Sequence, residues 1–145
     1  MHRTVHVPCR LRRPFEAEDV TAMVERLYRG RVTLHDGASE IADGVTAHLL
    51  GGHSRGLQFV PVRTQRGWVV VASDASHYYA NFEECRPFPI VCDVSEMLEG
   101  YNAMHRLASS PAHIVPGHGP PVLKRYPAAP GGPFDIVRLD AEPQR

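Results

Sequence analysis

Apolar residues recur at helical spacing in two stretches of the chain. Across residues 16–29 they fall at intervals of three and four, which predicts a one-faced amphipathic helix. Gly30 follows at the position of a C-terminal cap. The same spacing returns across residues 94–107, where Asp93 or Ser95 can act as the N-cap. The pattern therefore predicts two helices with a long region between them.

Alternating apolar and polar residues predict strands in that intervening region. Residues 31–34 and 40–50 are interrupted by the turn-forming pairs Asp36-Gly37 and Asp43-Gly44, a pattern typical of an antiparallel meander. A second hairpin is predicted from residues 57–63 and 68–72, which are joined through the sequence QRG. We therefore expect a run of neighbouring antiparallel strands.

Two details refine the second hairpin. Pro61 has no N–H to donate, so it favours an edge position or a bulge for the first strand. Residues 68–72 are apolar throughout, so both faces of that strand are expected to be covered. Later strands are predicted at Ile114-Val115 and at residues 134–139, with a short turn of helix near residues 122–125. This order predicts a mixed α/β fold, in which helices cover a sheet on at least one face.

Length and charge restrict the classes of protein to which this chain can belong. The 145 residues predict one domain, spanning 1–145. Sixteen basic residues balance sixteen acidic ones, and three arginines within positions 10–13 are too few for a nucleic-acid patch, so no nucleic acid or membrane partner is expected. No apolar run approaches the ~20 residues of a membrane span, and the N-terminus lacks the apolar core of a signal peptide. Three cysteines without CxxC spacing favour a reduced, cytoplasmic setting.

Three candidate metal ligands come directly after predicted strands. They are His53 in GGHSRG (51–56), Asp74 in ASDAS (72–76) and His118 in PGHGP (116–120). Neutral imidazole and carboxylate oxygen suit a zinc-type ion, and a catalytic site uses three protein ligands plus a water. Such an ion lowers the pKa of its water to ~7, which makes hydroxide available at neutral pH. The three strand ends together therefore predict a metal centre.

Two of these residues also have a structural explanation when each is taken alone. A loop histidine such as His53 is commonly a surface residue, and Asp74 can cap a helix that begins near Ser76. A carboxylate at the end of a buried strand is nevertheless costly unless it is paired or metal-bound. His118 lies within the sequence PGHGP, whose two prolines restrict the backbone on either side of the motif. Both explanations stay open for His53 and Asp74.

These motifs together resemble the metallo-β-lactamase fold hydrolases, most closely the N-acyl homoserine lactonase-like branch. The matching sequences are GHSRG (52–56), SDAS (73–76) and IVPGH (114–118). The intervals of 21 residues between His53 and Asp74 (74 − 53) and 44 between Asp74 and His118 (118 − 74) are ordinary for that branch. The resemblance covers a core of about residues 15–126. It implies a zinc-dependent hydrolase that opens lactone or ester rings with metal-bound hydroxide, an activity associated with quorum quenching.

The resemblance also implies a role for each ligand. In such enzymes two zinc ions are bound, so His53 would serve the first zinc, Asp74 would bridge the two, and His118 would serve the second. A tyrosine shortly after the aspartate polarises the substrate carbonyl. Here the third position after Asp74 is His77, followed by Tyr78, and these two are the candidate catalytic residues. Helix packing is the alternative role for Tyr78 and for the next residue, Tyr79.

The chain departs from the family pattern in one respect. It contains no HxHxDH motif, which supplies the remaining ligands in these enzymes. The family fold is an αββα sandwich, and the matched motifs correspond to its second half only, so we expect a single truncated domain with weak or no activity of its own. A non-catalytic alternative is a homodimer formed through an exposed sheet face, or one metal ion held by His53, Asp74 and His118.

Overall fold

The computed structural model describes residues 16–131 and 136–144, and the chain divides into two units, Met1–His35 and Asp36–Arg145. The arginines of positions 10–13 and the first residue of the predicted core, Phe15, lie outside the described residues. Among those described, no helix is long and apolar enough to cross a membrane. The elements are α2 (Ala17–Tyr28), β1 (Ala38–Ala42), β2 (Val45–Leu49), β3 (Gln58–Thr64), β4 (Gly67–Val71), η1 (Ser73–Ala75), α3 (Tyr79–Glu83), α4 (Val94–Leu107), η2 (Pro111–His113), β5 (Ile114–Val115) and α5 (Pro121–Arg125).

The first unit contains the predicted helix α2. Glu18 and Asp19 occupy its first turn, where acidic side chains interact favourably with the positive end of the helix dipole. Gly30 follows with φ of +65°, and its N–H donates to the carbonyl of Leu27 at 3.0 Å. The predicted C-terminal cap is therefore confirmed, because a left-handed residue at this position is favourable chiefly for glycine.

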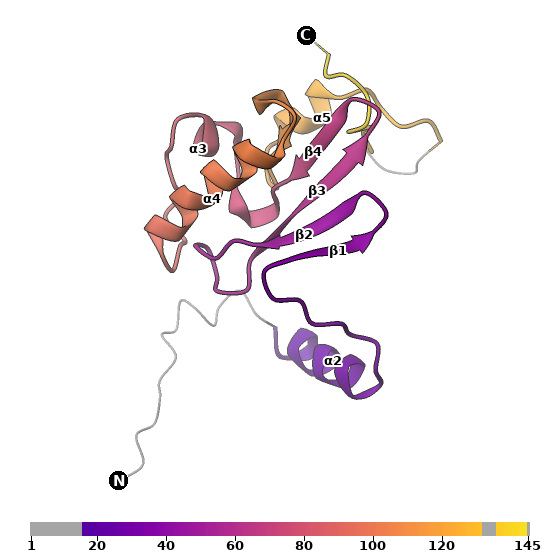
Figure 1. Ribbon diagram of the computed structural model, residues 1–145, viewed down its shortest axis with the longest axis vertical. Helices are drawn as coiled ribbons and strands as arrows, with labels where there is room; N and C mark the ends of the chain where they lie inside the picture. The colour runs from indigo at the N-terminus through magenta and orange to yellow at the C-terminus, as the bar shows by residue number, and fades with distance from the viewer. Residues whose placement is uncertain (1–15, 132–135, 145) are drawn as a thin grey trace. The chain divides into compact units, whose positions relative to one another are not determined.

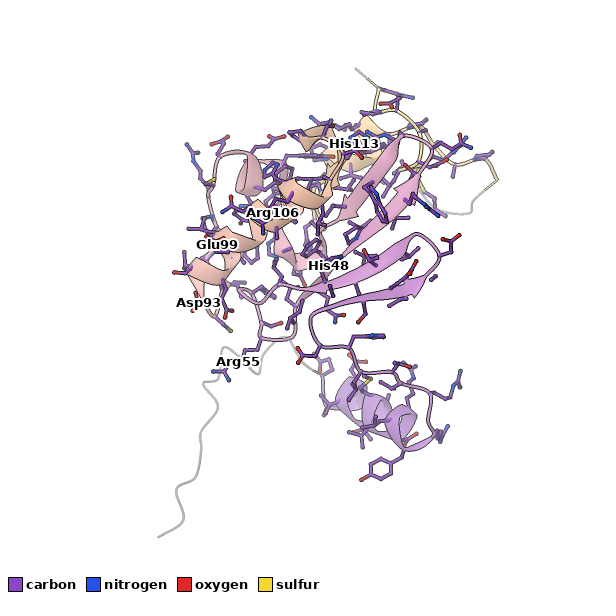
Figure 2. The ribbon with its side chains drawn as sticks, in the orientation of Figure 1. His48, Arg55, Asp93, Glu99, Arg106 and His113 are labelled. Carbon is purple, nitrogen blue, oxygen red and sulfur yellow. The ribbon has the colours of Figure 1, made fainter. Side chains whose placement is uncertain are left out.

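The second unit is built on a five-stranded sheet in the order β1-β2-β3-β4-β5 (Figure 1). The first four strands pair antiparallel, which confirms the predicted meander and hairpin. β4 and β5 pair in parallel, and the crossover between them contains α3 and α4. Asp93 caps α4, because its Oδ1 accepts a hydrogen bond from the N–H of Glu96 at 3.0 Å; Figure 2 shows Asp93 at the start of this helix. The fold is the predicted mixed α/β type.

Three strand predictions need correction. Residues 31–34 form no strand; they belong to the first unit, whose described residues include no partner strand. Of residues 134–139, the first two lie outside the described part, and the remainder makes only an isolated bridge between Val137 and Ala128. Pro61 lies in an interior strand rather than at an edge, since β3 pairs with both β2 and β4.

The sheet accommodates Pro61 by leaving a gap in one ladder. Paired positions between β2 and β3 stop at Val45 with Val62 and resume at His48 with Phe59. On the other side, Pro61 pairs regularly with Val70 of β4. The missing N–H therefore weakens only the β2–β3 ladder, and full burial of the ring compensates for part of that loss.

The main core lies between the sheet and the two crossover helices. Phe59, Val70 and Ile114 from the sheet pack against side chains of α3 and α4. These helix residues are nearly inaccessible to solvent: Phe82 of α3, and Met97, Tyr101 and Met104 of α4. Burial of side chains of this size stabilises the fold by roughly 1.5–3 kcal/mol each. Figure 1 shows α4 beside the sheet, next to β4.

The opposite face of the sheet carries a smaller cluster. Val69, Val115 and Tyr126 are buried there, with residues of the C-terminal segment packed against them. Because neighbouring residues of a strand point to opposite faces, Val69 and Val70 contribute to different clusters. The prediction that residues 68–72 are covered on both faces is therefore confirmed.

Polar contacts hold the C-terminal segment to the end of the hairpin. The side chain of Arg66 is 4% exposed, donates to the carbonyl of Leu139 at 3.2 Å, and lies 5.5 Å above the ring of Tyr126. His113, labelled in Figure 2, donates from Nε2 to the carbonyl of Arg66 at 2.7 Å and accepts at Nδ1 from the hydroxyl of Ser110 at 2.6 Å. His113 therefore has a structural role.

Replacement of Tyr101 by Phe is expected to stabilise the fold. Within the described part of the chain, the buried Tyr101 hydroxyl has no hydrogen-bond partner, so its removal should raise the free energy of unfolding by about 1 kcal/mol.

Burial also raises the pKa of Tyr101 to about 12, above the ordinary value near 10. The folded state therefore resists ionisation of this hydroxyl. The fold keeps its full stability below pH ~10 and loses stability as the pH rises from ~10 to ~12. Urea denaturation across this range would show a smaller alkaline loss for Tyr101→Phe; an equal loss in both proteins would contradict the assignment.

Candidate metal centre

The candidate site lies where the parallel strands β4 and β5 end. Their pairing continues into the two loops that follow: Ala72 donates to the carbonyl of Val115 at 2.9 Å, and Gly117 donates to that of Ser76 at 2.9 Å. Beyond that, the N–H of His118 donates to the carbonyl of His77 at 3.0 Å. These bonds place two segments that are about forty residues apart in the chain side by side, as the parallel register requires.

Close packing of the two loops explains the glycine before His118. A Cβ at Gly117 would lie 2.6 Å from the carbonyl oxygen of Ser73 and 2.8 Å from its carbonyl carbon. Both are backbone atoms, so they cannot move aside as a flexible side chain would. Only glycine therefore lets His118 approach the loop that carries Asp74.

Two imidazoles converge on one carboxylate oxygen at this position. The Nε2 of His118 lies 2.6 Å from Oδ1 of Asp74, and the Nε2 of His77 lies 3.4 Å from the same atom. One ligand atom from each residue lies within 4.8 Å of the other two. Among the described residues, Asp74 forms no ion pair with lysine or arginine, so its charge is met only by these histidines.

This donor set fits a small divalent transition metal. Bonds of 2.0–2.1 Å in a tetrahedral site imply a separation of roughly 3.3 Å between ligand atoms. The distance of 3.4 Å from His77 to Asp74 is close to this value, and the 2.6 Å distance from His118 to Asp74 needs to lengthen by about 0.7 Å. The side chains of His77, Asp74 and His118 are 20%, 37% and 56% exposed, so the group is open to an ion from solvent on the His118 side.

The ring of His77 is the most restrained of the three. It stacks on Phe88 with ring centroids 3.6 Å apart and planes inclined by only 9°. Burial lowers the pKa of His77; the nearby ring of His118 lowers it further, and Asp74 partly opposes the shift. His77 therefore favours the neutral form, which is the form of histidine that binds metals.

His53 lies beside this group but outside it. Its ring centroid is 6.1 Å from that of His77 and 5.5 Å from that of Phe88. Its Nδ1 donates to the carbonyl of Ile90 at 2.7 Å, since a carbonyl can only accept. The lone pair consequently lies on Nε2, which is the usual arrangement for a metal-binding histidine. Of the three predicted ligands, the structure brings Asp74 and His118 into contact, whereas the ring of His53 lies next to that of His77, with centroids 6.1 Å apart.

The two tyrosines, Tyr78 and Tyr79, lie in different environments. Tyr78 is exposed, with its ring 6.2 Å from that of His77 at 88°, whereas Tyr79 packs against Phe82 and lies under the guanidinium of Arg125 at 4.1 Å. Tyr79 therefore has the packing role, and burial raises the pKa of its hydroxyl.

The alternative role of Asp74 as a helix cap is wrong. Helix α3 begins at Tyr79, and the N–H of its cap residue, Tyr78, donates to Asn81 at 2.8 Å. Asp74 instead lies within the 3₁₀ turn η1, which has three residues per turn. His77 follows two residues after this turn ends, and its Nε2 lies 3.4 Å from Oδ1 of Asp74, so the predicted catalytic position lies within the ligand group.

Comparison with known proteins gives matches among solved structures. No protein-family model matches the chain, and neither does any curated protein. A structure of an N-acyl homoserine lactone hydrolase, with the product N-hexanoyl-L-homoserine bound at its catalytic metal centre, aligns with a TM-score of 0.57 and 28% identity over 63% of this chain and 37% of that one. The chain has a metallo-β-lactamase fold of the lactonase type.

Two more distant structures share this lactonase-type fold. A dizinc quorum-quenching lactonase aligns with a TM-score of 0.56 and 13% identity, over 78% of this chain and 38% of that one. A probable metal-dependent hydrolase from Staphylococcus aureus aligns with a TM-score of 0.55 and 16% identity, over 68% and 35%. The chain thus spans a little over a third of the length of the structures it matches.

Proposed function

We propose that this chain provides one side of a metal-dependent hydrolytic site that opens lactone or ester rings. The observation that carries the proposal is the convergence of two imidazoles on Asp74 at the ends of β4 and β5. Solved lactonases with this fold support it, one of them with an N-acyl homoserine product at its metal centre. We also propose that residues 1–145 correspond to the second half of an αββα sandwich, with a core of about 15–126.

The residues divide into ligands and a substrate-facing group. Asp74 and His118 would hold the metal ion, for which zinc is the proposed identity, and His53 would serve a neighbouring ion through its free Nε2. A bound zinc ion supplies Lewis acidity, which polarises a carbonyl and lowers the pKa of a water molecule. The exposed phenol of Tyr78 is the proposed hydrogen-bond donor to the substrate carbonyl.

Two contacts orient these groups. The carbonyl of Ile90 fixes the tautomer of His53, and Phe88 packs against the rings of both His53 and His77. Phe88 is itself 7% exposed, so it also keeps water from one side of the site. A substrate would therefore approach from the open side, where Tyr78 and His118 are exposed.

Ring opening of N-hexanoyl-L-homoserine lactone tests the proposed function. Proton release at pH 7.5–8, with and without zinc, is expected to show slow turnover that requires both the metal and Asp74. The matched control is Asp140→Asn, because Asp140 is an exposed carboxylate paired with Arg138 at 2.7 Å, outside the site. Equal rates for the unchanged chain and Asp74→Asn would contradict the proposal.

A further inference from the structure

We infer that Asp74, His77 and His118 form a complete three-ligand site for one divalent transition metal ion, in which His77 is a ligand and no other segment is required. The inference rests on the same site as the proposed function, but it concerns binding rather than turnover. It assigns to His77 a role different from contact with the substrate.

The number and type of donors support the inference. Three protein ligands with open positions are the pattern of catalytic zinc sites, and two imidazoles with one carboxylate also suit iron, cobalt and manganese. All three ligand atoms lie within 4.8 Å of one another. A single ion therefore needs only small movements of side chains to bind all three.

The direction of the His77 ring favours a ligand over a substrate contact. Its Nε2 points at Oδ1 of Asp74 at 3.4 Å, so this nitrogen belongs to the ligand group and not to the open side of the site. The ring plane is held by Phe88, with centroids 3.6 Å apart. Rotation toward solvent would break this stacking, so the ring is already positioned for the ion.

The backbone fixes His77 relative to both of its partners. Its carbonyl accepts from the N–H of His118 at 3.0 Å, which couples the two imidazoles directly. Asp74 lies three residues earlier, within the turn η1, and its Oδ1 is 3.4 Å from the Nε2 of His77. The three ligands therefore come from two loops that are hydrogen-bonded to each other, and binding an ion costs little additional ordering.

His53 does not belong to this site. Its ring centroid is 6.1 Å from that of His77, and its Nδ1 is engaged with the carbonyl of Ile90. It also falls outside the group whose ligand atoms meet within 4.8 Å. Loss of His77 should therefore strongly lower the affinity for a single ion, whereas loss of His53 should not.

Titration of the chain with Co²⁺, followed by visible absorption, tests the inference. Cobalt bound to imidazole and carboxylate absorbs in a way that depends on its coordination, so the readout is independent of hydrolysis. We expect one Co²⁺ per chain. His77→Gln should lower the affinity by roughly 100-fold or more and alter the spectrum, since even outer contacts of a ligand contribute 10–100-fold.

His53→Gln is a comparison variant that separates the three-ligand site from a site that uses His53, and His105→Gln is the control. His53→Gln should leave the Co²⁺ affinity within roughly threefold of the original, an effect smaller than one tenfold step in affinity. His105→Gln removes an exposed histidine of α4 and should have no effect. Circular dichroism of each variant shows whether it is folded. If His77→Gln proves unfolded, Phe88→Leu tests the same point, because freeing the His77 ring should lower the affinity by roughly 10-fold.

The outcomes distinguish the inference from the proposed function. Unchanged Co²⁺ affinity in folded His77→Gln, or an equal loss in His53→Gln, would overturn the three-ligand site. Co²⁺ binding that depends on His77, combined with no lactone hydrolysis, would uphold the site and overturn the hydrolytic proposal.

Discussion

Asp74→Asn is expected to abolish stoichiometric binding of zinc. Asp74 provides the only carboxylate of the three-residue ligand group, and both imidazoles converge on its Oδ1. An amide has the same shape but no charge, so the ion would lose its one anionic ligand. We expect the affinity to fall by about 100-fold or more, which corresponds to at least ~2.7 kcal/mol of binding free energy. Isothermal titration calorimetry with zinc measures this directly.

The same variant should leave the fold intact. Asp74 is 37% exposed, and among the described residues its carboxylate makes polar contacts with two histidines alone, so its replacement exposes no core and leaves no buried charge. The midpoint of urea denaturation should therefore stay close to that of the unchanged chain. Asp140→Asn controls for loss of one negative charge elsewhere and should bind zinc normally. Zinc binding by folded Asp74→Asn at the original affinity would exclude Asp74 as a ligand.

Gly117→Ala is expected to damage both stability and the site. The new Cβ would lie 2.6 Å from the carbonyl oxygen of Ser73, so the loops after β4 and β5 must separate. Overpacking of this kind costs about 1–3 kcal/mol of folding free energy. Separation would also move His118 away from Asp74, so the metal affinity should fall together with the urea midpoint.

Gly56→Ala is the matched control for that substitution. A Cβ at Gly56 meets no atom within 4 Å and no left-handed backbone conformation is needed there, so the change should stay within about 0.5 kcal/mol. If Gly117→Ala is as stable as Gly56→Ala and binds metal equally well, the close contact between the two loops is not what positions His118.

Local pattern predicted most of the elements in the described chain. The helices α2 and α4, the Asp93 cap and the hairpin of β3 and β4 follow from the spacing of apolar residues and from turn-forming pairs. These features depend on neighbours within a few residues, where backbone preferences and side-chain periodicity act. Pro61 shows the limit of such reasoning, because its interior position depends on how two flanking strands pair.

The candidate site was predicted in part for the same reason. His53, Asp74 and His118 can be found in the sequence because each follows a strand, and this places polar side chains at one edge of a sheet. The grouping could not be found in that way. His77 enters the group through the hydrogen bond that its carbonyl accepts from the N–H of His118 and through stacking on Phe88, a residue eleven positions further along the chain.

The amino-acid sequence by itself determined which residues are able to bind a metal and that they stand at strand ends. Only the tertiary structure decided which of them meet. The parallel pairing of β4 with β5 closes a crossover of about forty residues and brings His118 to Asp74, while Phe88 turns His77 toward the same oxygen. The physical reason is that short-range preferences act along the chain, whereas ligand geometry depends on packing between segments that are distant in sequence.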